Sequence, residues 1–313
     1  MDSIKIILLI FVCIFIGIYI FFKGLNFFSL NFRLFDLDNF FYKLNGWPEL
    51  LLIFIGIICS GIIQSTAICI TLLIPLVHEN KINIKNSFYL IIGFNIGTVI
   101  SLFISGIGFL GWIILLFCSN IILKIVESKT SKAYISILKN TVIGILLIFL
   151  GLFILKISFY ILTKTSFFNN LINSLLSNHM LSFLAGIILS AIIQSGSIIC
   201  NTFQQIYIST NVSIDGILLI IIGSNIGSSL IGILASFKFD LKSKMISYFH
   251  VGLNLIGSLI ILTFFNQFKN ILFTLTINKQ YQLSISHLLL NTLSGLVLIP
   301  FVNFLVNRIN KYI

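Results

Sequence analysis

The chain has 313 residues, of which 58% are apolar and only 9% are charged, with a formal net charge of +11. A soluble domain carries about 25% charged residues, so this composition excludes a water-soluble fold and predicts a chain embedded in a lipid bilayer. The positive charge does not indicate a nucleic-acid partner, because the lysines lie in short loops between apolar runs, as topology signals do.

The first half of the chain predicts three full membrane spans and one interrupted apolar segment. The full spans cover residues 4–25, 87–107 and 109–126, each close to the roughly 20 residues that cross a bilayer core. The interrupted segment, residues 48–78, has two short apolar stretches on either side of Gln64. Neither stretch can cross alone, so we expect a re-entrant helical hairpin with Gln64-Ser65-Thr66 near its tip.

The second half predicts the same order of elements. Its full spans cover residues 140–162, 216–236 and 244–266, and an additional span at 283–306 closes the chain. A second interrupted segment, residues 180–208, carries Gln194-Ser195 and predicts a second hairpin. The expected fold is an all-α integral membrane protein with about seven full spans plus two hairpins. Residues 1–130 form the first repeat and residues 131–313 the second, together one membrane domain.

An internal repeat supports this division. A shift of 130 positions places the first Gln-Ser motif on the second, and the first Gly-X-Asn-Ile-Gly motif on the second. Chance does not align seven polar or glycine positions at one offset: Gly56/Gly186, Ser60/Ser190, Gln64/Gln194, Ser65/Ser195, Gly93/Gly223, Asn95/Asn225 and Gly97/Gly227. Three full crossings per half is an odd number, so the second half is expected to lie inverted. Inverted repeats with paired broken helices are typical of secondary transporters.

The distribution of basic residues gives the expected orientation. With the amino terminus outside, the inner loops hold all but five of the 19 Lys and Arg residues; the exceptions are Lys5, Lys156, Lys164, Lys269 and Lys279. This bias follows the positive-inside rule. It predicts a multi-pass protein of the cell (cytoplasmic) membrane, with the amino terminus outside and the carboxyl terminus inside.

The chemistry expected at the hairpin tips is that of an anion site with a coupling cation. At each tip one short helix ends and another begins, and the beginning helix presents free N–H groups and a positive dipole end to an anion. No Asp or Glu lies in a predicted membrane centre, which favours Na⁺ held by neutral oxygens over a proton relay. No cofactor and no transition-metal site are expected. Hydroxyl and amide groups that can donate to anionic oxygens stand at Gln64, Ser65, Thr66, Gln194, Ser195 and Ser197.

Two further motifs leave alternatives open. The segments Gly93–Thr98 and Gly223–Ser229 suit either close helix packing or ligand binding, and their recurrence 31 residues after each Gln-Ser favours ligands. The pairs His250/Asn254 and His287/Asn291 each place both side chains on one helical face. Such pairs could line a pathway or form interhelical hydrogen bonds.

The duplicated motifs resemble those of the type II sodium/phosphate cotransporter family, in which each Gln-Ser-Ser-Ser is followed by Gly-Ala-Asn-Ile-Gly-Thr-Thr. The resemblance implies symport of inorganic phosphate with sodium. By motif, the phosphate ligands would be Gln64, Ser65, Thr66, Gln194, Ser195, Ser197, Asn95 and Asn225, and the residues supporting sodium Gln64, Gln194, Thr98, Ser228 and Ser229. Bacterial relatives often carry a soluble regulatory domain at the carboxyl end, which we do not expect here because the chain stops at Ile313.

Two departures from the family motif keep other functions open. Ala67 and Gly196 each stand where the family has a hydroxyl. A transporter of another small anion, or a transport-inactive membrane scaffold or sensor, is therefore an alternative. An intramembrane hydrolase using Ser195 or Ser197 with His250 lacks a Gly-x-Ser-x-Gly motif and leaves the duplicated Gln and Asn residues without a role, so an enzyme is not expected. Association of several copies of the chain stays open.

Overall fold

The computed structural model describes residues 8–20, 23–24, 43–104 and 164–312, with short stretches at 143–144, 146–147, 150–151, 153–154, 157–158 and 161. The chain divides into two compact units. One comprises Met1–Leu37 and Ile104–Asn170, and the other Asp38–Phe103 and Leu171–Ile313. Every candidate site residue named above lies in the second unit, so the fold is described there.

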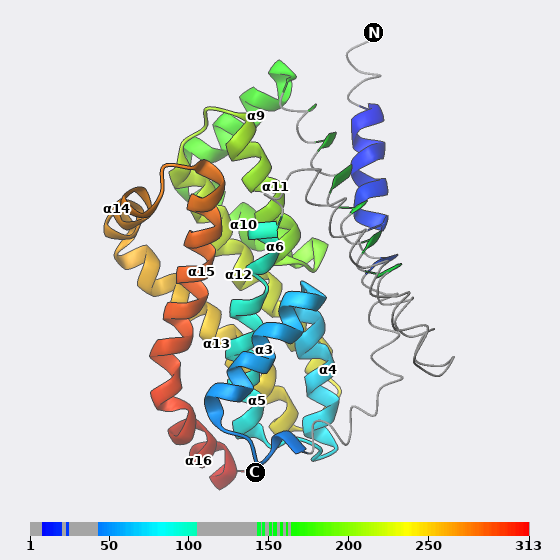
Figure 1. Cartoon of the computed structure of the whole chain (residues 1–313), viewed down its shortest axis with the longest axis vertical. Helices are drawn as coiled ribbons and strands as arrows, with labels where there is room; N and C mark the ends of the chain where they lie inside the picture. Colours follow the sequence, from blue (N-terminus) through cyan, green and yellow to red (C-terminus); the bar gives the residue numbers. More distant parts are fainter. Residues whose placement is uncertain are drawn as a thin grey trace, which may run out of the picture. The chain divides into compact units, whose positions relative to one another are not determined.

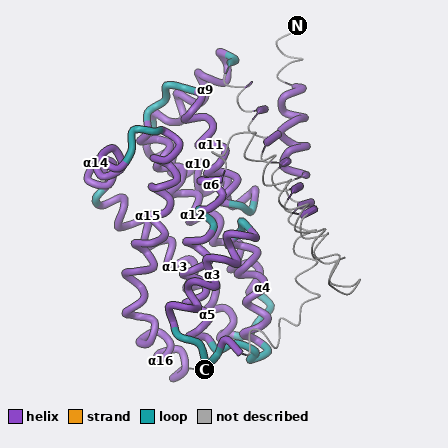
Figure 2. The backbone as a smooth tube through the Cα atoms, viewed as in Figure 1, coloured by secondary structure: helices purple, strands orange, loops and turns teal. Residues whose placement is uncertain are grey.

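The prediction of an all-helical membrane protein is confirmed. Every regular element in the described residues is a helix (Figure 2). Four helices are long and apolar enough to cross a bilayer: Ile84–Phe103, Ile214–Ser236, Leu241–Thr263 and Lys279–Lys311. They coincide with four of the seven predicted spans. The predicted span 109–126 lies outside the described residues, as do parts of 4–25 and 140–162, although Leu8–Ile20 is helical.

The helices keep the numbering of Figure 1. In chain order they are α3 (Glu49–Ile63), α4 (Thr66–His78), α5 (Ile84–Gly97), α6 (Ile100–Ile104), α9 (Ser166–Ser177), α10 (His179–Ile193), α11 (Gly196–Ser209), α12 (Ile214–Ser236), α13 (Leu241–Thr263), α14 (Phe265–Leu275), α15 (Lys279–Leu298), the 3₁₀ turn η1 (Ile299–Phe301) and α16 (Val302–Tyr312). The pairs α3–α4 and α10–α11 occupy the two segments predicted as hairpins.

The pair α3–α4 folds back on itself. The Nδ2 atom of Asn45, just before α3, donates to the carbonyl of Lys81, just after α4, over 3.1 Å. Asn86 Nδ2 likewise donates to the Leu44 carbonyl over 2.9 Å. A straight helix from Asn45 to Lys81 would hold these two residues roughly 54 Å apart at 1.5 Å per residue. The two arms therefore form a hairpin whose tip is the break at Gln64 and Ser65.

The pair α10–α11 closes in the same way. Gly216, near the start of α12, packs so closely on Leu176, just before α10, that a Cβ atom there would meet the Leu176 backbone. Both ends of this hairpin therefore lie together, with the tip at Gln194 and Ser195. Figure 1 shows the first hairpin low and the second high in this unit.

Motif glycines set how closely each hairpin packs on its neighbouring span. α3 packs on α5 and α10 packs on α12. A Cβ on Gly93 would come within 3.0 Å of the Ile53 carbonyl oxygen, and one on Gly223 within 3.0 Å of the Phe183 carbonyl oxygen. The glycines of the Asn-Ile-Gly segments thus serve close helix packing, the first of the two alternatives left open by the sequence. α5 and α12 each also contact α13 and α15.

Two short helices were not predicted. α9 precedes the second hairpin and meets α10 at 109°. α14 connects α13 to α15 and buries Phe268 and Leu272, which share a helical face. Lys269, also on α14, pairs with Asp215 at the start of α12 over 3.0 Å. Both helices are amphipathic and too short to span a bilayer, so neither contains the long apolar run that predicts a span.

Candidate functional site

Each hairpin tip has the same backbone geometry. Gln64 ends α3 with φ 56°, and Gln194 ends α10 with φ 60°, both in the left-handed region. The next residue is extended and caps the following helix: Ser65 Oγ accepts from Ile68 N over 3.3 Å, and Ser195 Oγ accepts from Ile198 N over 3.4 Å. The capping leaves each serine hydroxyl hydrogen available as a donor.

The left-handed glutamines are a strained choice. Outside glycine this conformation costs roughly 1–2 kcal/mol, and glycine is the usual residue at such helix ends. Strain of this kind persists where a side chain is needed at that position, which makes both tips functional candidates. The sequence repeat places the same strained residue in both copies.

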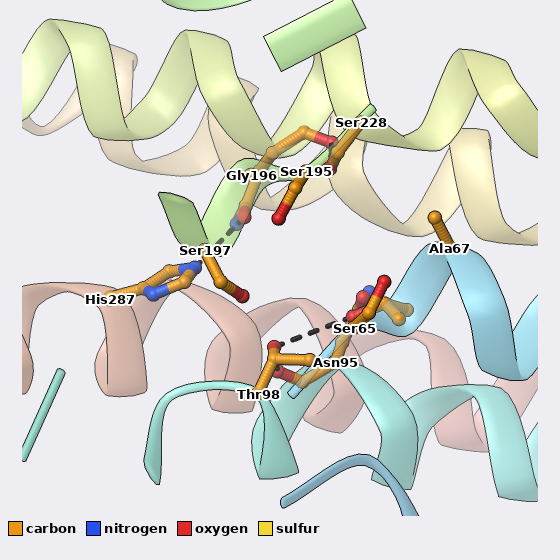
Figure 3. A pocket seen from close by; sticks show the side chains of 11 residues that line it. Ser65, Ala67, Asn95, Thr98, Ser195, Gly196, Ser197, Ser228 and His287 are labelled. Carbon is orange, nitrogen blue, oxygen red and sulfur yellow. Dashed lines mark hydrogen bonds between the residues drawn. The ribbon is translucent and has the colours of Figure 1, made fainter. Parts of the chain in front are cut away.

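A small cavity lies between the two tips (Figure 3). Its volume is about 10 Å³, room for about one water. Among the described residues that line it none is a Lys, Arg, Asp or Glu; polarity comes from hydroxyls, amides and one imidazole. The lining consists of Ser65, Thr66, Ala67, Asn95, Thr98, Ser195, Gly196, Ser197, Asn225, Ser228 and His287.

Hydroxyl groups from the motif spans complete the cavity wall. Thr98 Oγ1 donates to the Asn95 carbonyl over 2.9 Å, and Ser228 Oγ to the Asn225 carbonyl over 3.1 Å. Thr66 Oγ1 lies 3.4 Å from Thr98 Oγ1, which joins the first tip to α5. The first residues of α4 and α11 line the same cavity, so both helix amino termini face it.

The two motif asparagines are tied to the late helices. Asn95 Nδ2 donates to Asn254 Oδ1 over 2.8 Å, and Asn225 Nδ2 donates to Asn291 Oδ1 over 2.8 Å. The His-x-x-x-Asn pairs therefore form interhelical hydrogen bonds. His287 also lines the cavity, so both alternatives that the sequence left open for these pairs apply to it, although it was not named among the site residues.

Three predicted ligands do not line this cavity. Gln64 is buried, and its Oε1 has no hydrogen-bond donor in the described part of the chain. Gln194 is exposed. Ser229 is buried on α12 and its Oγ donates to the Ile226 carbonyl over 2.7 Å. The remaining predicted residues, from both halves of the sequence, meet at the cavity.

Comparison with known proteins gives one family and one relative. The family model described as Na+/Pi-cotransporter matches residues 20–157 and 162–279. A Bacillus subtilis (strain 168) protein named "Uncharacterized protein YqeW" is 22% identical over 261 residues, covering 83% of this chain and 83% of its own length. No solved structure matches the chain.

Proposed function

Because the chain belongs to the Na+/Pi-cotransporter family, we propose that it is a symporter that moves inorganic phosphate with sodium across the cytoplasmic membrane. The observation that carries this proposal is the cavity between the hairpin tips, walled by two helix amino termini and by neutral hydroxyl and amide groups. Such a wall suits a small oxyanion that must be released again, because it offers hydrogen bonds without a fixed positive charge.

Phosphate would be held by both tips. The free N–H groups at the start of α4 and α11, with the hydroxyls of Ser65 and Ser195, belong to residues that line the cavity and would donate to an anion there. Thr66 adds a hydroxyl on the first tip and Ser197 one on the second. Asn95 and Asn225 contribute amide hydrogens from the motif spans. The oxygens of one phosphate carry enough lone pairs to accept from all these donors at once.

Sodium would supply the missing charge. Each helix amino terminus is equivalent to roughly half a positive charge, so two termini give about +1. A phosphate dianion then keeps about one negative charge, which a coupled cation neutralises. The buried Oε1 of Gln64 has no hydrogen-bond donor in the described residues and is an acceptor that a sodium ion would satisfy. Gln194, Thr98, Ser228 and Ser229 would support sodium in the other parts of the site.

Transport would proceed by alternating access between two inverted repeats. The cavity of about 10 Å³ is smaller than phosphate, so the tips must part for the anion to enter. Each hairpin accepts a hydrogen bond from a lysine at a residue just after its second helix, at the end away from its tip, and these two bonds are called the ties. Lys242 donates to Asn80 Oδ1 and Lys279 to the Thr210 carbonyl, each over 2.8 Å. Asn80 and Thr210 are 130 residues apart, the offset of the sequence repeat. With the amino terminus outside, one tie would lie at each membrane face.

Uptake of radiolabelled phosphate into proteoliposomes tests the proposal. An inward sodium gradient should drive accumulation, and an equal potassium gradient should not. Gln64→Ala and Gln194→Ala should lower uptake at least tenfold, since each removes a side chain proposed to bind the coupled ions. Uptake that ignores sodium, or that survives both substitutions, contradicts the proposal.

Matched variants on α4 separate the site from general effects of substitution. Thr66→Val removes a cavity hydroxyl and should weaken phosphate uptake. Thr71→Val removes a hydroxyl further along α4 whose Oγ1, among the residues that the structure describes, bonds only to the Ile68 carbonyl, and should leave uptake unchanged. Competition with unlabelled sulfate identifies the anion: sulfate that displaces phosphate at equal concentration would favour the alternative of a transporter for another small oxyanion.

A further inference from the structure

Four buried asparagines and two buried histidines form one hydrogen-bonded network at the wall of the cavity. They lie on α5, α12, α13 and α15, and each is at most 7% exposed: Asn95, Asn225, His250, Asn254, His287 and Asn291. Three of them, Asn95, Asn225 and His287, line the cavity on which the proposed function rests, and the first two are amides. The hydrogen bonds of the network determine which way each of these two amides is oriented.

The first chain of bonds starts at a backbone carbonyl, which can only accept. Asn254 Nδ2 donates to the Asn225 carbonyl over 2.8 Å, which leaves Asn254 Oδ1 facing Asn95. Asn95 must then present its Nδ2, at 2.8 Å, and its Oδ1 faces His250 Nε2 at 3.1 Å. Each amide orientation thus follows from the one before it rather than from an arbitrary choice between oxygen and nitrogen.

The second series of hydrogen bonds repeats the first, with residues of the two sequence halves exchanged. Asn291 Nδ2 donates to the Asn95 carbonyl over 2.8 Å, Asn225 Nδ2 donates to Asn291 Oδ1 over 2.8 Å, and His287 Nε2 lies 2.9 Å from Asn225 Oδ1. The side chain of Asn95 takes part in one series of hydrogen bonds and its backbone carbonyl in the other, and the same holds for Asn225. The four asparagines therefore close into a ring that joins both motif spans.

Each histidine ends a chain as a donor. The Asn oxygen that it faces can only accept, so Nε2 must carry the imidazole hydrogen. The Nδ1 atoms of His250 and His287 are both buried without a partner in the described residues, and a hydrogen there would lack an acceptor. Asn254 Nδ2 also lies 3.3 Å from His250 Nε2, farther than the Asn95 oxygen. Both histidines are therefore assigned the Nε2–H form.

We propose that His250 and His287 are positioning residues for phosphate: they hold the amides of Asn95 and Asn225 so that the second N–H of each donates to the anion. Each amide nitrogen gives one hydrogen to a neighbouring asparagine and keeps one. An amide turned the other way would offer phosphate an oxygen and repel it. This inference rests on the proposed phosphate transport. It gives the two histidines a role in phosphate binding that does not require either of them to contact the anion.

Paired substitutions test the role. The amide nitrogen of glutamine can reach the position of histidine Nε2, whereas that of asparagine reaches only the position of Nδ1. His250→Asn and His287→Asn should therefore raise the KM for phosphate roughly tenfold, the effect of one lost hydrogen bond to a charged group, with the maximal rate and the sodium dependence unchanged. His250→Gln and His287→Gln should restore KM to within about twofold of the unsubstituted protein. Equal KM values for the Asn and Gln variants overturn the inference.

A second measurement does not depend on transport. The chain has four histidines, so ¹⁵N-histidine spectra of the purified protein can be assigned with the Gln variants. Both buried histidines should show the Nε2–H form, and an Nδ1–H form in either overturns the inference. If the unsubstituted protein takes up no phosphate, the proposed function fails and the positioning role fails with it. Uptake without the Asn–Gln difference contradicts the positioning role alone.

Discussion

At the scale of single residues, each Gln-Ser motif has lost one hydroxyl relative to the family, and the two losses fall at different positions. The first tip has a hydroxyl at Thr66 and none at Ala67, whereas the second has none at Gly196 and one at Ser197. The sequence repeat makes Thr66 equivalent to Gly196 and Ala67 equivalent to Ser197. All four line the same cavity, so each tip supplies the hydroxyl that the other lacks. The departures from the family motif therefore reduce the number of proposed ligands but leave one hydroxyl at each tip.

Exchanging these hydroxyls should change phosphate affinity in opposite directions. Ser197→Ala removes a donor from the cavity wall, and a hydrogen bond to a charged group contributes about 1.5–3 kcal/mol, so the phosphate KM should rise at least tenfold. Ala67→Ser adds a donor at the equivalent place and should lower KM several-fold. Concentration-dependent uptake measures both. An unchanged KM in Ser197→Ala would place the anion elsewhere.

Substitutions at a strained glutamine can separate the effect on stability from the effect on transport. Gln194 is exposed, so replacing it removes few contacts. Gln194→Gly should stabilise the protein by about 1 kcal/mol relative to Gln194→Ala, because glycine adopts positive φ without a steric cost. Both variants should nevertheless lose uptake. Thermal unfolding in detergent, measured beside uptake, checks this. A glycine variant that transports normally would mean that the side chain has no role.

At the scale of helices, close backbone approach holds each hairpin on its span. Gly93 and Gly223 lie where a methyl group would collide with a backbone carbonyl of α3 or α10. Backbone atoms cannot move aside as a flexible side chain can. The hairpin arms are too short to cross a bilayer alone, so this packing is what places each tip at the cavity.

Adding one methyl group at these glycines should displace the hairpins. Gly93→Ala and Gly223→Ala should each destabilise the protein by about 1–3 kcal/mol and lower uptake, as overpacking does. Gly252→Ala is the matched control: Gly252 lies in α13 with no atom of the described residues within 4 Å of an added Cβ, and alanine favours a helix by about 1 kcal/mol. Thermal unfolding of the three variants distinguishes them. Equal stability of all three would contradict the packing argument.

The sequence predicted helices well where hydrophobic length and the repeat agreed. The hairpins expected at 48–78 and 180–208 match α3–α4 and α10–α11 almost to the residue, because a polar Gln-Ser interrupts each apolar run. α9 and α14 were missed because short amphipathic helices carry no span-length signal. The span at 283–306 was predicted as an addition to the repeat. Its helix α15 instead makes the same hydrogen bonds to Asn225 that α13 makes to Asn95.

At the scale of the whole molecule, the site is a product of both halves. Residues near 65 and 195, more than a hundred positions apart in sequence, meet at one cavity. The repeat predicted which residues correspond to one another, and the motifs predicted most of the cavity wall. The sequence left open whether the His/Asn pairs line a pathway or bond between helices. It could not predict that Asn254 is the partner of Asn95, or that His287 lines the cavity, because partners on distant helices depend on tertiary packing.

Symport through this site requires that phosphate and sodium bind together between the two tips. Equilibrium binding of radiolabelled phosphate to the purified protein, in sodium and in potassium, tests this most directly, with Thr66→Val/Ser197→Ala as the variant that removes one hydroxyl from each tip. We predict one phosphate bound per chain in sodium, much weaker binding in potassium, and loss of binding in the double variant. Binding of equal strength in potassium, or binding that the double variant retains, would contradict the account.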